Sequence, residues 1–344
     1  MKIGKIDDRT FATLFRNRLG RPDPTVLVPP QTGVDAGVVD IGGGRILVVA
    51  EDPIFTMPRL PLRVFGRFTV HIGASDVAVM GVKPRYMTYS LLLPPETSLA
   101  DLRTLVDSIH RAARELDIAI VGGHTGFYPG FAAPTIGGIT VFAIAKKGQY
   151  VTPAGARPGD AVVLTKGPAI ETAALLSVLR EEELRGRYPE RLIRKAKSLC
   201  RSISVVRDAL AAMAAGGVTA MHDATEGGVI GGLYEIAAAS GVGLEADERL
   251  VLYPPEVRMV CEAFGLDPLY AIAEGSLLIT ARPRSVVGVI RNLARARIPA
   301  SVIGRVTAQP RKRLIRRADG RTEHLAIPPQ DPFWPAFFKG LEKV

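Results

Sequence analysis

The sequence predicts a mixed α/β fold of the α+β class, divided into two domains. Runs of β-branched residues alternate with helical spacing in both halves of the chain. Hairpin-like turns join these runs as often as helices do, which favours mixed sheets covered by helices over a doubly wound parallel sheet. Prolines and glycines gather between residues 148 and 159, as at a domain boundary. We therefore expect domains at residues 1–150 and 151–310, followed by a hairpin and a C-terminal tail at 311–344.

The composition is that of a globular protein. Of the 344 residues, 47% are hydrophobic, 23% are charged and only 6% are aromatic, so the chain can bury a core but has few rings for stacking bases. The first residues hold no apolar run of signal-peptide length, and no stretch reaches the ~20 apolar residues of a membrane span. Cys200 and Cys261 are isolated, so neither a disulfide framework nor a structural zinc site is indicated. We expect a cytoplasmic protein without membrane association.

The formal net charge of +10 favours anionic partners, either nucleic acid or nucleotide phosphates. The main basic cluster, Arg311–Arg317, leads into Asp319-Gly320 and a second charged run, which predicts a β-hairpin with a type I′ turn. Alternating charge on a hairpin is typical of a solvated face or a guarded edge strand. No helix-turn-helix, zinc finger or RNA-binding sequence accompanies it. Nucleic-acid binding is therefore not the expected function.

The first domain is predicted to begin with a short helix over residues 11–19. A turn at 33–36 enters a strand, and Gly42-Gly43-Gly44 is typical of a hairpin turn before the β-branched run Ile46–Val49. This glycine run is not a Walker A loop, because no Gly-Lys-Ser/Thr follows it. The next strand is expected to end at Glu51-Asp52-Pro53, because proline cannot donate a hydrogen bond to a ladder.

Helical spacing of apolar residues then predicts a helix over 62–80, and residues 85–93 form a strand-like run. Ser98 and Asp101 have the positions of an N-cap and its capping-box partner, which predicts a helix over 98–116. A strand over 118–121 is expected to run into a glycine-rich turn at 122–126. A further strand follows over 135–145.

The second domain alternates strand and helix signals. The predicted elements are a strand over 161–165, a helix ending near 180, an exposed charged helix over 181–197, helices over 205–215, 229–239 and 285–296, and a strand over 276–280. The sequence between 220 and 228 connects a strand to the start of a helix and contains paired glycines.

Four acidic residues lie at element ends, in turns or inside an apolar helix. Asp76 stands in an apolar helix, where a lone carboxylate is costly unless it is paired, and Asp52 is expected to end a strand. Asp35 and Asp223 lie near glycines in turns. Mg²⁺ prefers carboxylate oxygens and bridges one or two protein acids to substrate phosphates. The acids therefore predict a shared metal site, and the alternative is an N-cap with a buried salt bridge.

Glycines at 33, 37, 122, 123, 227 and 228 would let backbone N–H groups approach phosphate oxygens, although each pair is also compatible with an ordinary tight turn. Thr225 precedes a helix N-terminus, which favours an anion. His124 and His222 lie in the same glycine-rich segments as candidate ligand contacts. Lys166 follows a strand end and is either a phosphate contact or a solvated lysine.

Six motifs in this order resemble those of the aminoimidazole ribonucleotide (AIR) synthetase-like, or PurM-like, family of ATP-binding proteins. They are Gly33-Val34-Asp35-Ala36 (G-x-D-A), Glu51-Asp52-Pro53 (T-D-P), Ser75-Asp76-Val77-Ala78 (N-D-x-A), Gly122-Gly123-His124-Thr125 (G-G-D/H-T), Asp223–Gly228 (D-x-T-x-G-G) and Ala273-Glu274-Gly275 (N-E-G). Together they span nearly the whole chain. Within the family, the sequence most resembles the HypE branch, which acts in hydrogenase maturation.

The resemblance implies a two-domain fold whose N-terminal mixed sheets pair across a homodimer into a β-barrel, with an α/β sandwich as the C-terminal domain. It implies that ATP and Mg²⁺ bind beside the barrel. The metal residues would be Asp35, Asp52 and Asp76, and the catalytic residues Asp76, Asp52 and His124. The nucleotide-binding residues would be Gly33, Asp35, Gly122, Gly123, Thr125, Lys166, Asp223, Thr225, Gly227 and Gly228.

Two departures from the HypE pattern narrow the expected function. HypE proteins end in a cysteine that is carbamoylated, whereas this sequence ends in an aromatic segment without cysteine, so no self-carbamoylation is expected and the segment should pack or dock. His124 replaces an aspartate that HypE usually has. The sequence favours an ATP-dependent enzyme that activates an oxygen of a small-molecule or protein-borne substrate by phosphorylation. The alternatives are a small-molecule kinase resembling thiamine-monophosphate kinase and a non-catalytic nucleotide-binding scaffold.

Overall fold

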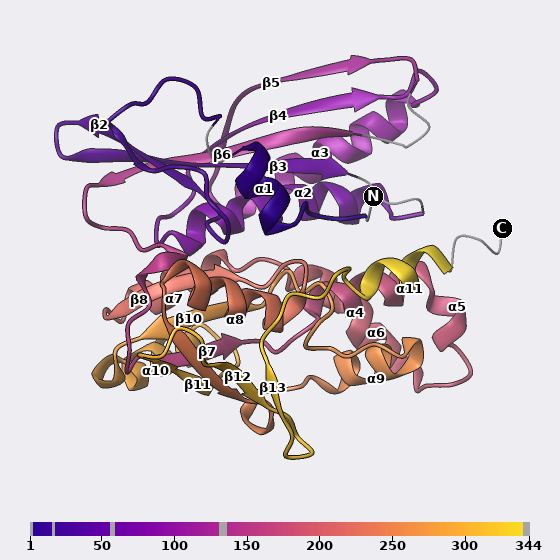
Figure 1. Ribbon diagram of the computed structural model, residues 1–344. Helices are drawn as coiled ribbons and strands as arrows, with labels where there is room; N and C mark the ends of the chain where they lie inside the picture. The colour runs from indigo at the N-terminus through magenta and orange to yellow at the C-terminus, as the bar shows by residue number, and fades with distance from the viewer. Residues whose placement is uncertain (1–2, 16–17, 56–58, 131–135, 340–344) are drawn as a thin grey trace.

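The computed structural model describes residues 3–15, 18–55, 59–130 and 136–339. Each half of the chain contains one β-sheet, and the helices α2 and α3 lie between the first sheet and the second half (Figure 1). The predicted mixed α/β architecture with two sheets is confirmed. The barrel, which needs a second copy, remains a prediction.

The first sheet has the strand order β1-β2-β3-β6-β4-β5. Its pairs are antiparallel except for β4 and β5, which are parallel. The strands are β1 (Val26–Val28), β2 (Gly37–Gly42), β3 (Arg45–Phe55), β4 (Tyr86–Leu93), β5 (Ala119–Phe127) and β6 (Ile136–Lys146), and the helices are α1 (Asp8–Leu14), α2 (Leu62–Val79) and α3 (Leu99–Glu115). In β3 the alternating residues Ile46, Val48 and Ala50 are buried, so one face of the sheet covers the core.

Helix α2 is surrounded by other elements, so nearly every face of it carries apolar residues. It packs on β3 and β6, on α3, and on α7 and β8 of the second half. Gly66 allows α3 to approach closely, since a Cβ there would lie 2.7 Å from the Cβ of Ser108. The α3 N-cap is Ser98, as predicted, and its hydroxyl accepts from the N–H of Asp101.

The second sheet has the order β13-β12-β9-β11-β7-β10-β8, with β9 and β12 as its parallel pair. Its strands are β7 (Ala161–Thr165), β8 (Val218–Asp223), β9 (Gly243–Asp247), β10 (Leu277–Ala281), β11 (Ala300–Thr307), β12 (Arg313–Arg316) and β13 (Thr322–His324). The helices are α4 (Ile170–Leu179), α5 (Glu181–Leu184), α6 (Glu190–Ser198), α7 (Val206–Met213), α8 (Gly228–Ala239), α9 (Pro255–Phe264), α10 (Val286–Arg295) and α11 (Phe333–Lys339). Short 3-10 helices occupy Pro153–Gly155, Leu199–Arg201, Glu248–Leu250 and Pro283–Ser285.

The aromatic segment near the C-terminus packs onto the main core. Packing was one of the two expectations for it, and docking onto a partner was the other. Phe333 is fully buried, and Trp334 and Phe337 are nearly so. The rings of Phe333 and Phe337 stack at 5.7 Å. The guanidinium of Arg180 donates to the carbonyl of Ala336 at 2.5 Å, which ties α11 to α4.

Several predicted element boundaries are wrong. Strand β3 continues through Asp52 and Pro53 to Phe55. Strand β2 begins only at Gly37, opposite Val49, so no β2 residue pairs with Pro53 and its missing N–H is tolerated on that side. The glycine-rich segment 122–126 is not a turn but part of strand β5. It follows a β-bulge that lies between the β5 residues paired with Met87 and with Thr88.

Three further corrections concern turns and helix ends. The charged helix expected over 181–197 is split into α5 and α6, because Gly186 has a φ of +76° and Pro189 precedes α6. Helix α1 covers Asp8–Leu14 rather than 11–19, and residues 16–17 lie outside the described residues. The hairpin of β12 and β13 has a positive φ at Gly320 but not at Asp319, so its turn is not type I′.

Within the described ranges, no helix combines the length and the apolar character that crossing a bilayer requires.

Candidate active site

Four aspartates from distant parts of the sequence meet where α2 lies against the second half of the chain. Asp35 lies in the loop before β2, Asp52 in β3, Asp76 in α2 and Asp223 at the end of β8. The side chains of Asp52 and Asp76 lie close enough to interact, and burial raises the pKa of Asp52. Burial also raises the pKa of Asp76 well above its ordinary value, and the charges of Asp52, Asp223 and Asp35 raise it further. These carboxyl groups therefore act on one another directly.

A glycine in α2 brings Asp52 and Asp76 together. A Cβ at Gly73 would lie 3.1 Å from Ile139 Cγ2 on β6 and 3.7 Å from Asp52 Oδ2, so the helix approaches β3 and β6 closely at this point. Asp76 follows three residues later, on the same face of the helix. Asp76, the lone acid of an apolar helix, thus points toward Asp52 on β3.

Several carboxyl oxygens at and near this cluster are buried without a hydrogen-bond partner. They include both oxygens of Asp223, Asp52 Oδ2, Glu274 Oε2 and Glu171 Oε2. Burial, followed by the charge of Asp35, raises the pKa of Asp223 to about 7, and burial raises the pKa of Glu171 to about 8. Buried carboxylates without partners destabilise a fold unless a cation balances them. Their oxygens are the ligand type that Mg²⁺ prefers, so the residues present fit this metal.

His222 on β8 connects two acids of the site. Its Nδ1 lies 2.7 Å from Asp35 Oδ2, and its Nε2 lies 2.7 Å from Glu235 Oε2 on α8. Burial lowers the pKa of His222, but Asp35 and Glu235 outweigh it and raise the pKa well above its ordinary value. As an imidazolium, His222 donates to both carboxylates and fixes the orientation of Asp35. Ligand atoms of Asp35, His222 and Asp223 all lie within 4.8 Å of one another.

The segment 223–228 lies at this cluster as a tight turn into α8. Gly227 and Gly228 have φ values of +81° and +60°, and a Cβ at Gly228 would lie 2.6 Å from the carbonyl oxygen of Leu269. The N–H of Gly227 donates to Asp331 Oδ2 at 2.8 Å, and Thr225 Oγ1 accepts from the ammonium of Lys5 at 3.0 Å. Gly33, with a φ of +70°, lies against Glu235 and brings the Asp35 loop onto α8.

The other candidate residues lie elsewhere in this chain. Gly122, Gly123, His124 and Thr125 are exposed on β5, and β6 and β4 separate β5 from β3. At about 4.8 Å per strand, the separation is roughly 14 Å. His124 Nε2 is hydrogen-bonded to the hydroxyl of Tyr128 at 2.6 Å. The ammonium of Lys166 donates to the carbonyl of Ser204 at 2.7 Å and lies 3.0 Å from Asp208 Oδ1, so it is neither solvated nor part of the acidic cluster.

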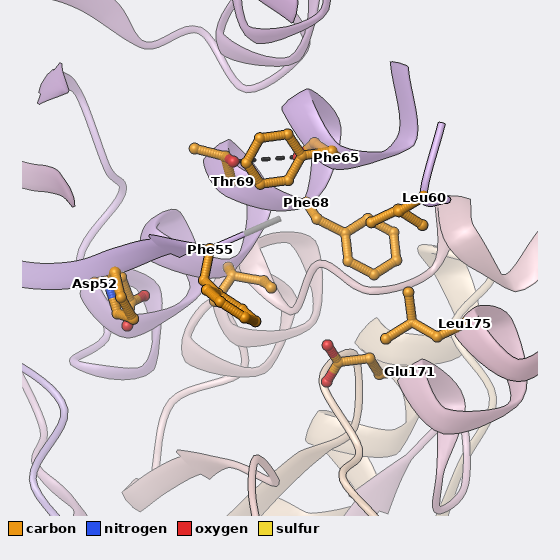
Figure 2. Close-up of a pocket in the computed structure, with 10 residues that line it drawn as sticks. Asp52, Phe55, Leu60, Phe65, Phe68, Thr69, Glu171 and Leu175 are labelled. Atoms are coloured by element: carbon orange, nitrogen blue, oxygen red, sulfur yellow. Dashed lines mark hydrogen bonds between the residues drawn. The ribbon is translucent and has the colours of Figure 1, made fainter. Parts of the chain in front are cut away.

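A cavity of about 70 Å³, partly open to solvent, has Asp52 in its lining. Phe55, Phe65, Phe68 and Leu175 form its apolar wall, and Glu171 reaches toward it from α4 (Figure 2). Since Asp52 belongs both to the cavity lining and to the acidic cluster, the cavity lies next to the cluster.

Sequence reasoning missed Glu171, Glu235 and Lys5 as members of the site. Glu171 carried a usable signal, because it stands in an apolar helix just as Asp76 does. Glu235 lies two turns into the apolar helix α8, where its partner on β8 cannot be read from spacing. Lys5 lies in a terminal segment without periodicity.

Comparisons with known proteins identify the family of the chain. The model of the AIR synthase related protein N-terminal domain matches residues 33–145, and that of the C-terminal domain matches residues 157–317. Carbamoyl dehydratase HypE of Cupriavidus necator is 34% identical over 257 residues, which cover 72% of this chain and 69% of that protein.

Solved structures with the same fold include two HypE complexes and a ThiL complex. The HypE–HypF complex matches with a TM-score of 0.74 at 22% identity, covering 93% of this chain and 98% of that chain. HypE in complex with ATP matches with a TM-score of 0.73 at 24% identity, covering 96% and 97%. AaThiL complexed with AMPPCP and TMP matches with a TM-score of 0.70 at 18% identity, covering 91% and 92%. The chain therefore belongs to the AIR synthase related protein family, as a relative of the HypE carbamoyl dehydratases.

Proposed function

We propose that this chain is a Mg-ATP-dependent enzyme that transfers the γ-phosphoryl group of ATP to the oxygen of a carboxamide-type substrate, so that this oxygen leaves as phosphate. The observation that carries the proposal is the meeting of buried, unpartnered carboxyl oxygens from β3 and β8 with the buried Asp76 of α2. The carbamoyl dehydratase activity named for its relative from Cupriavidus necator supports the substrate class. The shared fold with HypE in complex with ATP supports the nucleotide.

The acids divide into two roles in this proposal. Asp52, Asp76 and Asp223 would hold Mg²⁺. Asp35, whose orientation is fixed by its hydrogen bond with His222, would lie beside the ion as a further negative charge. A bound Mg²⁺ would neutralise the negative charge on the phosphate oxygens during transfer. The close approach of Gly33 to α8 would hold the Asp35 loop beside these acids. Gly227 and Gly228 would line the phosphate groove with backbone that carries no side chain, since their N–H groups already donate to Asp331 and to the carbonyl of Thr225. The cavity at Asp52 would hold the organic part of the substrate.

Neither cysteine of the sequence can serve as a carbamoyl acceptor in this fold. Cys200 and Cys261 are buried, and burial raises the pKa of Cys200 to about 11 and that of Cys261 to about 12. A thiol of this kind is neither accessible nor ionised. We therefore propose that another molecule presents the substrate. The HypE–HypF complex in the same fold supports a protein as the carrier.

Product analysis tests the proposal. With Mg-ATP and the small carbamoyl thioester S-methyl thiocarbamate, we expect ³¹P NMR to show ADP and free phosphate in step with formation of methyl thiocyanate. A stable phosphorylated acceptor, for example from thiamine monophosphate, would instead favour the kinase that the AaThiL likeness makes the second candidate. ATP binding without turnover on either substrate would contradict both and favour a non-catalytic scaffold.

We further propose that the domain boundary lies at residues 150/151. We also propose that the chain forms a homodimer in which β5 of one copy pairs with the other copy. Strand β5 is a sheet edge whose residues are exposed except for Gly126, and Ile120, Val121 and Phe127 expose 39%, 54% and 48% of their surface. An exposed apolar edge strand of nine residues is a template for pairing with another chain. The glycine motif of β5 would then reach the acidic cluster only in the dimer.

Val121→Lys is expected to convert the dimer to a monomer, because it places a charge on the apolar edge. Sedimentation velocity at micromolar concentration should show the mass fall to about half. Leu99→Lys is the matched control, since Leu99 is 78% exposed at the start of α3 and should leave the mass unchanged. A wild-type chain that already sediments as a monomer would contradict the dimer.

A further inference from the structure

The N-terminal segment Ile3–Asp7 lies between the two halves of the chain and is attached to the turn that follows Asp223 (Figure 1). The N–H of Lys5 donates to Glu226 Oε2 at 2.9 Å, and its ammonium donates to Thr225 Oγ1 at 3.0 Å. A Cβ at Gly4, where φ is +116°, would lie 2.4 Å from Glu226 Oε2. A φ of this sign favours glycine, so Gly4 suits the backbone conformation in which Lys5 meets Glu226.

The ammonium of Lys5 contacts Thr225, two residues after Asp223, and interacts electrostatically with the acidic cluster. Desolvation lowers the pKa of Lys5, but the attraction of surrounding carboxylates outweighs it and raises the pKa above its ordinary value. These carboxylates are Glu235, Asp35, Asp76 and Asp223. Burial raises the pKa of Asp52 and of Glu274, and the charge of Lys5 opposes this rise. The residue keeps exposed surface, so its ammonium can leave the cluster without disturbing the core.

The carboxylates around this ammonium remain short of partners. Both oxygens of Asp223 and Asp52 Oδ2 are buried and unpartnered even with Lys5 in place. Lys5 balances their charge through space, while its hydrogen bonds go to Thr225 and to Glu226. A cation that coordinates the carboxyl oxygens would satisfy these atoms better, and a second positive charge beside it would then be repelled.

We propose that Lys5 is the counter-ion of the acidic cluster when no divalent cation is bound, and that it gives up this place, together with the docking of residues 3–7, when such a cation enters. This role rests on the metal site of the proposed function. The proposed role of Lys5 adds to that site a cation from the chain itself, which competes with the divalent cation for the acidic cluster. Divalent-cation binding and release of the N-terminal segment are then two sides of one equilibrium.

Metal affinity without nucleotide tests the exchange. Mn²⁺ binding, followed by electron paramagnetic resonance of the free ion, should be ~5-fold or more tighter in Lys5→Met than in wild type, since no ammonium has to be displaced. Gly4→Ala, which keeps the ammonium but disturbs the docking, should change the affinity in the same direction. Arg21→Met is the control, because Arg21 is exposed and pairs with Asp23 away from the cluster.

Hydrogen–deuterium exchange gives the second readout. Adding Mn²⁺ to the wild-type chain should speed exchange in the peptide that contains the Lys5 amide, because its bond to Glu226 is lost. Equal Mn²⁺ affinity in wild type and Lys5→Met, or slower exchange on adding Mn²⁺, would overturn the role of Lys5 while leaving the metal site intact. Absence of Mn²⁺ binding in every variant would overturn both this role and the metal site.

Discussion

Asp76→Asn is expected to abolish Mg-ATP turnover and, at the same time, to stabilise the metal-free protein near pH 8. The loss of activity should be on the order of 100-fold or more, the size of effect seen when one electrostatic partner of a transferring group is removed. The gain in stability follows from burial, which raises the pKa of Asp76 well above its ordinary value, and from the charges of its neighbours, above all Asp52. An asparagine keeps the shape and removes the buried charge, which we expect to be worth roughly 1–3 kcal/mol.

Steady-state phosphate release and thermal denaturation in EDTA measure the two effects. Asp107→Asn is the matched control, because Asp107 lies exposed on α3 and should change neither quantity. Most substitutions that remove activity also lower stability or leave it unchanged. Opposite signs in one variant are therefore diagnostic of a buried acid kept for function. Undiminished hydrolysis by Asp76→Asn would contradict its role.

The stability of the metal-free chain is expected to fall as the pH rises from about 4 to about 8, and Mg²⁺ should restore it at pH 8 but not at pH 5. The folded-state pKa values of Glu171, about 8, and Asp223, about 7, lie above those of unfolded carboxylic acids. Groups with raised folded-state pKa values favour the folded state fully below their unfolded pKa, and this contribution is lost as the pH rises through the folded pKa. The loss from these two acids should amount to a few kcal/mol.

Two variants separate the proton effect from the metal effect. Glu171→Gln should flatten the pH dependence while keeping the stabilisation by Mg²⁺, because Glu171 lies at the cavity rather than with the four aspartates. Asp223→Asn should lose most of the stabilisation by Mg²⁺ at pH 8. Denaturant unfolding with and without Mg²⁺ at both pH values measures these quantities. A Mg²⁺ effect that is equal at pH 5 and pH 8 would show that the ion does not bind at these acids.

The sequence predicted the part of the site that depends on local anomalies. Asp76 could be found because a lone acid in an apolar helix needs an explanation, and the turn into α8 could be found because paired glycines precede a helix. The same rule would have found Glu171. Asp52 was recognised, but for an incorrect reason, since β3 does not end there. Where β2 begins opposite β3 depends on sheet pairing, which the spacing of residues along one strand does not determine.

Contacts between distant segments could not be predicted from local sequence patterns. The pairing of His222 with Asp35 and Glu235 joins a loop, a strand and a helix that only the packed fold brings together. The glycines of β5 have the composition of a turn, yet they follow a bulge and continue an edge strand. Lys5 reaches Thr225 over a separation of 220 residues. The His222 and Lys5 contacts depend on the packing of the two halves, and the β5 strand depends on its pairing with β4.

Anomalous diffraction from crystals grown with Mn²⁺ and a non-hydrolysable ATP analogue tests the central claim most directly. The claim is that Asp52, Asp76 and Asp223 bind one nucleotide-associated cation. We expect an anomalous peak about 2–2.5 Å from carboxyl oxygens of at least two of these residues, the range of metal–oxygen distances for such ions. A nucleotide bound with its cation at another face of the molecule, and these three carboxyl groups still without a cation, would contradict the account.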